Sequence, residues 1–152
     1  MKLGEALSLL KKEQGSLSRL ISLRRDNLYV EEGKKTNFNS KKLSEDIDKK
    51  IEDIRKLKIK IQKTNLSTKI KEENISLAEA IIKVNDFRSK ISDLSNLFER
   101  EKSYLFREKE TKEMIPQLEQ QEIENKIEEL KTEKVQLDNK IQVTNWTTEL
   151  ID

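Results

Sequence analysis

Apolar side chains in this chain recur at alternating steps of four and three residues, the spacing of one face of an α-helix. Between residues 3 and 28 this row consists of Leu3, Leu7, Leu10, Gln14, Leu17, Ile21, Arg24 and Leu28. Between residues 43 and 61 it consists of Leu43, Ile47, Lys50, Ile54, Leu57 and Ile61. Each row predicts an amphipathic helix whose apolar face carries one or two polar side chains.

The second half of the chain shows the same spacing. Between residues 77 and 98 the row consists of Leu77, Ile81, Val84, Ile91 and Phe98, with a neighbouring row of Ala80, Phe87 and Leu94. Between residues 123 and 141 it consists of Ile123, Ile127, Leu130, Lys134, Leu137 and Ile141. The pattern predicts an all-α protein with four long helices, each of about 24 to 28 residues, or about 36 to 42 Å.

Several residues mark where these helices begin. Ser40 is an expected N-cap of the second helix, and Ser76 followed by Glu79 forms the pattern of a capping box, which places the start of the third helix at Leu77. Pro116 is tolerated in a first helical turn, so the fourth helix is expected to start near residues 115–118. Residues 102–116 show no clear period, and their conformation is not assigned.

An internal repeat organises the chain. Residues 60–70 match residues 140–150 at six of eleven positions, and residues 3–23 match residues 77–97 more loosely. Both arms of a helical hairpin therefore occur twice, in residues 1–70 and 74–152. We predict a single helical domain over residues 1–152, in which two antiparallel hairpins form a four-helix bundle or coiled-coil-like structure, with room for a short β hairpin in a loop.

The amino-acid composition excludes most kinds of catalytic site. The chain has no His and no Cys, which excludes Ser-His and Cys-His nucleophiles, thiolate or imidazole zinc sites and disulfides. Glutamate pairs at helical spacing, Glu110 with Glu113 and Glu119 with Glu122, suit a carboxylate metal site, but such pairs arise freely among 29 acidic residues. We expect no enzyme activity, no catalytic residue, no cofactor and no metal.

The net charge and hydropathy of the chain limit the classes of partner that it is expected to bind. The 31 basic and 29 acidic residues leave a net charge of +2, too balanced for a dedicated nucleic-acid binder. No uninterrupted apolar run exceeds three residues, whereas a membrane-spanning helix needs roughly 20 mostly apolar residues. We therefore expect neither a nucleic-acid nor a membrane partner. The lack of a recognisable secretion signal and of Cys indicates a cytoplasmic protein.

The repeat also singles out residues for a structural role. Glu5 and Glu79 each lie two residues after the first leucine of a helix, where a carboxylate interacts favourably with the helix dipole. Thr64-Asn65 and Thr144-Asn145 follow the last isoleucine of the second and fourth helices, and are expected to end them. Beyond them, Leu66 and Trp146 are expected to fold back as buried apolar plugs; an exposed Trp146 would instead suggest a partner-binding tail.

The chain resembles the septicolysin-like family of small bacterial proteins. The residues that carry this resemblance are Met1-Lys2-Leu3, Glu5-Ala6-Leu7, Ile61, Thr64-Asn65 and Asn145-Trp146-Thr147-Thr148-Glu149-Leu150. The resemblance implies an all-helical fold and supplies no catalytic residue. The family's name implies an oxygen-labile cytolysin, which needs a Cys that this chain lacks. Residues 107–114, strand-like in such relatives, are rich in Lys and Glu here.

These observations lead to one main functional hypothesis. Long helices in a chain with 34% hydrophobic residues leave narrow bundles, whose remaining apolar faces are usually covered by oligomerisation. We expect a helical interaction or scaffold protein without catalytic activity that associates with itself as a homo-oligomer, and that also has room for an unknown protein partner. The alternative is a membrane-active, toxin-like protein, which the family name suggests.

Overall fold

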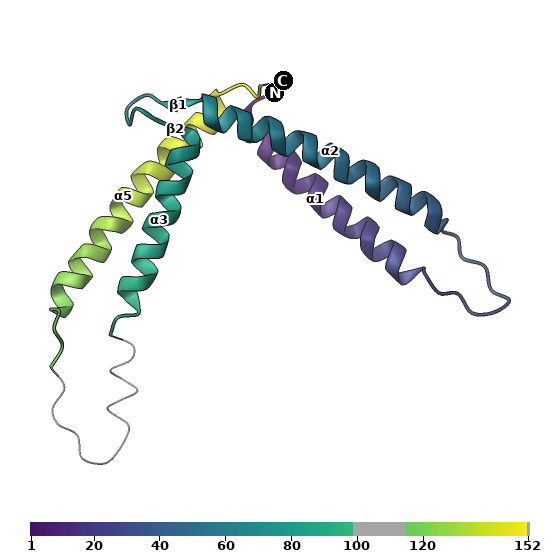
Figure 1. Ribbon diagram of the computed structural model, residues 1–152, viewed down its shortest axis with the longest axis horizontal. Helices are drawn as coiled ribbons and strands as arrows, with labels where there is room; N and C mark the ends of the chain where they lie inside the picture. The colour runs from purple at the N-terminus through teal and green to yellow at the C-terminus, as the bar shows by residue number, and fades with distance from the viewer. Residues whose placement is uncertain (99–114, 152) are drawn as a thin grey trace, which may run out of the picture. The chain divides into compact units, whose positions relative to one another are not determined.

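The structure is a computed structural model that describes residues 1–98 and 115–151. In chain order its elements are α1 (Leu3–Asp26), α2 (Ser40–Ser67), β1 (Lys69–Ile70), β2 (Ile75–Ser76), α3 (Leu77–Ser95) and α5 (Gln120–Thr147). Within the described residues the fold is therefore four helices and one small antiparallel sheet, which confirms the predicted all-α class (Figure 1).

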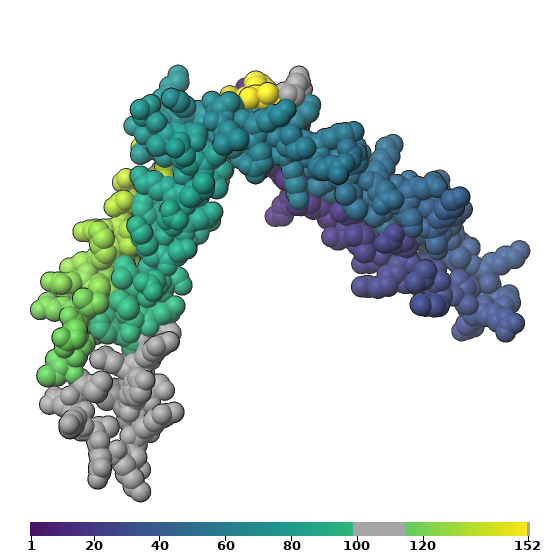
Figure 2. Space-filling view, in the orientation of Figure 1, coloured from purple at the N-terminus to yellow at the C-terminus, as the bar shows by residue number. Residues whose placement is uncertain are grey.

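The chain divides into two compact units. The first contains Met1–Thr68 and Thr144–Asp152, and the second contains Lys69–Val143. In the first unit α1 and α2 lie side by side and run antiparallel, in contact along their lengths (Figures 1 and 2). In the second unit α3 and α5 form the corresponding hairpin. Each unit thus has its own core between two helices.

In the first unit, α2 buries the row that its sequence predicts, whereas α1 does not. Of the α2 row, Leu43, Ile47, Ile54 and Ile61 are at most 8% exposed. On α1 the buried positions are Leu3, Gly4 and Ala6, while Leu7 and Ile21, both expected in the row, are 37% and 41% exposed. The core side of α1 therefore follows Leu3 and Ala6 and leaves Leu7 beside the contact.

The second unit buries equivalent positions. Its core contains Leu77, Ala80, Val84 and Phe87 of α3 together with Leu130, Leu137 and Ile141 of α5. Leu77 and Ala80 are both 74 residues after Leu3 and Ala6, so the two hairpins use the same side of their first helix. The repeat found in the sequence is therefore also a repeat of packing.

The short sheet follows α2 and precedes α3 in the chain. Lys69 pairs with Ser76 and Ile70 with Ile75, and the turn contains Asn74 in the left-handed conformation with φ of 52°. Asn tolerates this conformation better than most residues. A short strand pair is thus present in a loop, while residues 107–114, the stretch considered from the sequence, lie outside the described residues.

Helix starts match the sequence in one case and differ in two. Ser76 caps α3 as predicted, and Ser76 Oγ accepts a hydrogen bond from Glu79 N at 3.1 Å. The cap of α2 is Asn39 rather than Ser40, because the Asn39 side chain accepts hydrogen bonds from the backbone of Lys41 and Lys42. Helix α5 begins at Gln120, after the expected range of residues 115–118, so Pro116 lies outside the helix.

Candidate functional site

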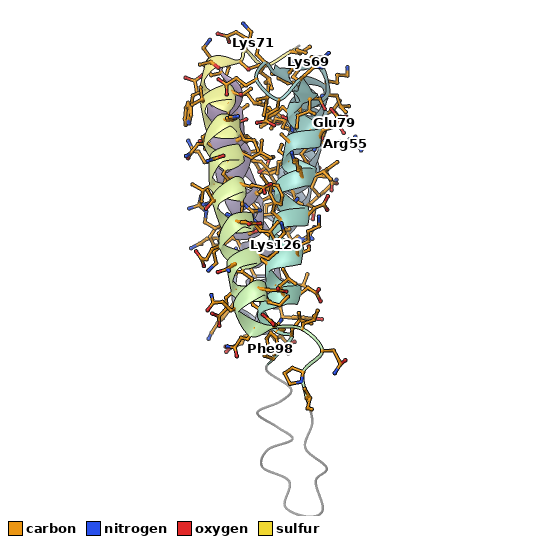
Figure 3. The ribbon with its side chains drawn as sticks, turned by 90° about the vertical axis from the view of Figure 1, so that its left-hand side faces the viewer. Arg55, Lys69, Lys71, Glu79, Phe98 and Lys126 are labelled. Carbon is orange, nitrogen blue, oxygen red and sulfur yellow. The ribbon has the colours of Figure 1, made fainter. Side chains whose placement is uncertain are left out.

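The two glutamates that the sequence singles out both cap a helix. Glu79 Oε2 accepts hydrogen bonds from the backbone N and the hydroxyl of Ser76, each at 2.7 Å. Glu5 Oε2 accepts one from Lys2 N at 2.7 Å. These bonds satisfy backbone amides that have no partner inside the helix. Figure 3 shows Glu79 near Lys69 at one end of the α3–α5 hairpin and Phe98 at the other.

The hydrogen bonds from Ser76 lower the pKa of Glu79 below its ordinary value of 4.5, and Lys69 adds to the effect. A lowered pKa in the folded state means that the ionised carboxylate contributes stability above the unfolded pKa and loses it as the pH falls. We expect Glu79→Gln to reduce the loss of melting temperature between pH 6 and pH 3, because glutamine keeps an acceptor but does not titrate. Thermal melts at both pH values test this; equal losses in the two proteins would contradict it.

The predicted helix ends at Thr64-Asn65 and Thr144-Asn145 are wrong. Helix α2 continues to Ser67 and α5 to Thr147. Thr64 is fully buried, and its hydroxyl donates to Lys60 O at 2.8 Å and accepts from Ile151 N at 3.0 Å. Asn65 and Asn145 are also buried, at 8% and 7% exposure. These residues do not end a helix. They are buried near the end of each helix, and Thr64 bonds the end of α2 to the chain after α5.

The expected burial of Trp146 and Leu66 is also wrong. Trp146 is 55% exposed and Leu66 is 68% exposed. One face of the Trp146 ring nevertheless covers the start of α1, because a Cβ added at Gly4 would lie 2.8 Å from Trp146 Cδ2. Trp146 therefore packs on the surface of α1 at Gly4 and is not a buried residue of the core.

The residues after α5 pair with the residues before α1. Leu3 N donates to Thr148 O and Leu150 N donates to Met1 O, both at 2.9 Å. The side chain of Lys2 contacts Glu149 at 2.6 Å, and Lys2 is the main cause of the lowered pKa of Glu149. The bridge between Lys2 and Glu149 repeats the pairing of Lys69 with Ser76, at positions that the sequence repeat makes equivalent.

Two further charge clusters join elements within a unit. Lys140 of α5 contacts Glu73 at 2.6 Å and Glu72 at 3.2 Å, so α5 is tied to the turn between β1 and β2. The hydrogen bond from Lys140 lowers the pKa of Glu73, and the same contact raises the pKa of Lys140. In the first unit, Lys50 of α2 contacts Glu13 of α1 at 2.5 Å. Both clusters position helices.

The described residues show no arrangement for metal binding or for crossing a membrane. Across residues 1–98 and 115–151, no group of three acidic side chains is close enough to hold a metal ion. Over the same part of the chain, no helix is long and apolar enough to span a bilayer. Glu119 and Glu122 are exposed, and the other candidate pair, Glu110 with Glu113, lies outside the described residues.

Two grooves lie along α3 and α5 in the described part of the chain. One of about 390 Å³ has a floor of Phe87, Leu94 and Leu130 and a rim of charged side chains. A second of about 510 Å³ is lined mostly by polar side chains of α5. Neither groove contains the residues that the sequence singled out.

Two residues where the chain after α5 meets the start of α1 were not predicted from the sequence. Gly4 makes room for Trp146, and Glu149 pairs with Lys2. Glu149 could have been found from the repeat, since it is equivalent to Lys69. Nothing in the local sequence connects Gly4 with Trp146.

Comparison with known proteins gives a family and one structural neighbour. Residues 11–150 match the family described as "Family of unknown function (DUF6847)". The chain is 29% identical to a functionally unknown conserved protein from Corynebacterium diphtheriae whose crystal structure is known, with a TM-score of 0.85 over 99% of each chain. A comparison with curated proteins gives no match.

These findings correct the resemblance drawn from the sequence. The matching family and the neighbouring structure are both of unknown function, and neither is septicolysin-like. The short motifs at Met1-Lys2-Leu3 and Asn145–Leu150 are the residues that join the two ends of the first unit. They join these two segments of the first unit and do not identify a cytolysin.

Proposed function

We propose that this chain, which belongs to the family of unknown function DUF6847, is a helical interaction protein that associates with itself and acts without catalysis. The observation that carries the proposal is the exposure of large apolar side chains along the outer sides of the helices. On α1 and α2 these include Leu7, Ile21 and Ile51, which are between 37% and 45% exposed.

Rows of exposed apolar residues on a helix differ from single exposed residues. Isolated exposed leucines are normal on a protein surface. A row at helical spacing on one side of a two-helix hairpin is different, because a partner helix can bury all of it at once, and each fully buried side chain contributes about 1.5–3 kcal/mol. A thin hairpin gains more from a partner than a protein with a larger core does.

The molar mass in solution tests the proposal. We expect light scattering after size-exclusion chromatography to give a discrete homo-oligomer at micromolar concentration, with a concentration-dependent melting temperature. A clean monomer at high micromolar concentration would contradict it. We further place the assembly in the cytoplasm, which a Cys-free chain suits; the toxin-like alternative loses its basis with the septicolysin resemblance.

A further inference from the structure

The first unit has an unpartnered apolar face with a definite composition. Leu7 and Ile21 of α1 are 14 residues apart, which is four helical turns, so both point to the same side of the helix. Ile51 of α2 is 45% exposed. We call the surface formed by Leu7, Ile21 and Ile51 the outer row.

Contacts between the helices show that these residues share one side of the hairpin. Arg24, three residues after Ile21, donates a hydrogen bond to the hydroxyl of Ser44 at 3.2 Å, and Ser44 is seven residues before Ile51. Residues three and seven apart lie on the same helical face. The Glu13–Lys50 ion pair occupies core positions nearer the opposite side.

The charged residues beside the outer row are arranged so that opposite charges meet when two copies of the hairpin are related by a two-fold axis. Asp48 and Arg55 are both exposed, and they precede and follow Ile51 by three and four residues on the same helix. In an antiparallel contact of α2 with a second α2 centred near Ile51, Asp48 faces Arg55 of the other copy, and Arg55 faces its Asp48. Arg55 also pairs with Glu52 in its own helix, yet remains 64% exposed.

The same centre suits α1. Because α1 and α2 run antiparallel, the contact of Glu13 with Lys50 places Ile51 level with Lys12, and the contact of Arg24 with Ser44 places it level with Leu17. Gln14 lies between these two levels, so we take it as the residue of α1 nearest to Ile51 along the hairpin. Leu7 and Ile21 are each seven residues from Gln14, so a two-fold axis at this level brings Leu7 of one copy onto Ile21 of the other. The same two-fold axis therefore pairs both the apolar and the charged residues, as an interface between identical surfaces requires.

We propose that a second copy of this chain docks on the outer row, α1 against α1 and α2 against α2, around a two-fold axis near Ile51. This inference rests on the proposed self-association and names its surface. Two helices of 24 and 28 residues present a face about 36–42 Å long and about 20 Å wide. That size is comparable to the roughly 800 Å² that each partner buries in a standard interface.

A matched pair of variants tests the surface. Ile51→Glu places two carboxylates near the axis and removes two apolar contacts, so it weakens self-association by about 100-fold or more in sedimentation equilibrium. Ile59→Glu is the control, because Ile59 is on the same helix and is 49% exposed, but points about 80° away around the helix. It changes the dissociation constant by less than about three-fold. Equal effects of the two variants overturn the proposal.

Charge exchange tests the two-fold register. Asp48→Arg alone or Arg55→Asp alone places like charges opposite each other and weakens self-association by about ten-fold. An equal mixture of the two single variants restores it, because each copy then offers the charge that the other lacks. Failure of the mixture to associate more tightly than either variant overturns the register.

The outcomes also separate this inference from the proposed function. If the wild type is oligomeric and Ile51→Glu does not weaken the oligomer, the outer row is not the interface, although the chain still associates with itself. A monomeric wild type overturns both. A monomer whose melting temperature falls on Ile51→Glu but not on Ile59→Glu means that the outer row is covered within one chain, which also overturns docking of a second copy.

Discussion

Replacing Phe87 by Ala should lower the free energy of unfolding by about 3 kcal/mol, because it empties the largest side-chain volume in the core of the second unit. Phe87 is 7% exposed and forms the floor of the α3–α5 groove with Leu130, which is 5% exposed. Chemical denaturation monitored by circular dichroism measures this change. A loss below about 1 kcal/mol would mean that the two helices do not pack through Phe87.

The repeat supplies the control for this prediction. Glu13 and Lys50 occupy the positions equivalent to Phe87 and Leu130, and they form an ion pair in which the side chains are 25% and 27% exposed. Partly solvated ion pairs contribute much less than a buried aromatic ring. Glu13→Ala should therefore destabilise the protein far less than Phe87→Ala. If Glu13→Ala costs as much, the first unit depends on its ion pair instead of on its leucines and isoleucines.

Replacing Gly4 by Ala should destabilise the protein by about 1–3 kcal/mol, the usual cost of forcing extra volume into a close contact. The added Cβ would lie 2.8 Å from Trp146 Cδ2 and 2.9 Å from Cε3, so the indole must move away from α1. Trp146 is the only tryptophan, and its fluorescence should shift towards longer wavelength as the ring loses its cover.

Gly15→Ala is the matched control for this substitution. Gly15 lies in the same helix, and a Cβ there would meet nothing within 4 Å. Alanine is favoured over glycine inside a helix by about 1 kcal/mol, so this variant should gain stability and leave the fluorescence unchanged. If Gly4→Ala were also stabilising, with unaltered emission, Trp146 would not rest on α1.

The sequence alone predicted the features that depend on local physics. The helical rows of α2 and α5 follow from their spacing, and the capping box of Ser76 and Glu79 follows from the hydrogen bonds that a helix start needs. The β1–β2 pairing was less visible, because two-residue strands leave no periodic signal. The helix end at Thr64 was misjudged because its hydroxyl bonds to the preceding turn of a helix that continues to Ser67. Helix α5 likewise continues past Thr144 to Thr147.

Only the tertiary structure decided which face of a helix packs against its neighbour when the spacing of apolar residues allows more than one. On α1, the row through Leu7 and Ile21 and the row through Ala6 share Leu3 and Leu10, so spacing cannot say which one meets α2. Packing selects Ala6, whose small side chain permits close approach of the two helices, and leaves Leu7 exposed. The contact of Trp146 with Gly4 likewise needs the chain end to return to α1. Periodicity and capping arise within a few residues, whereas these choices depend on contacts between segments far apart in the chain.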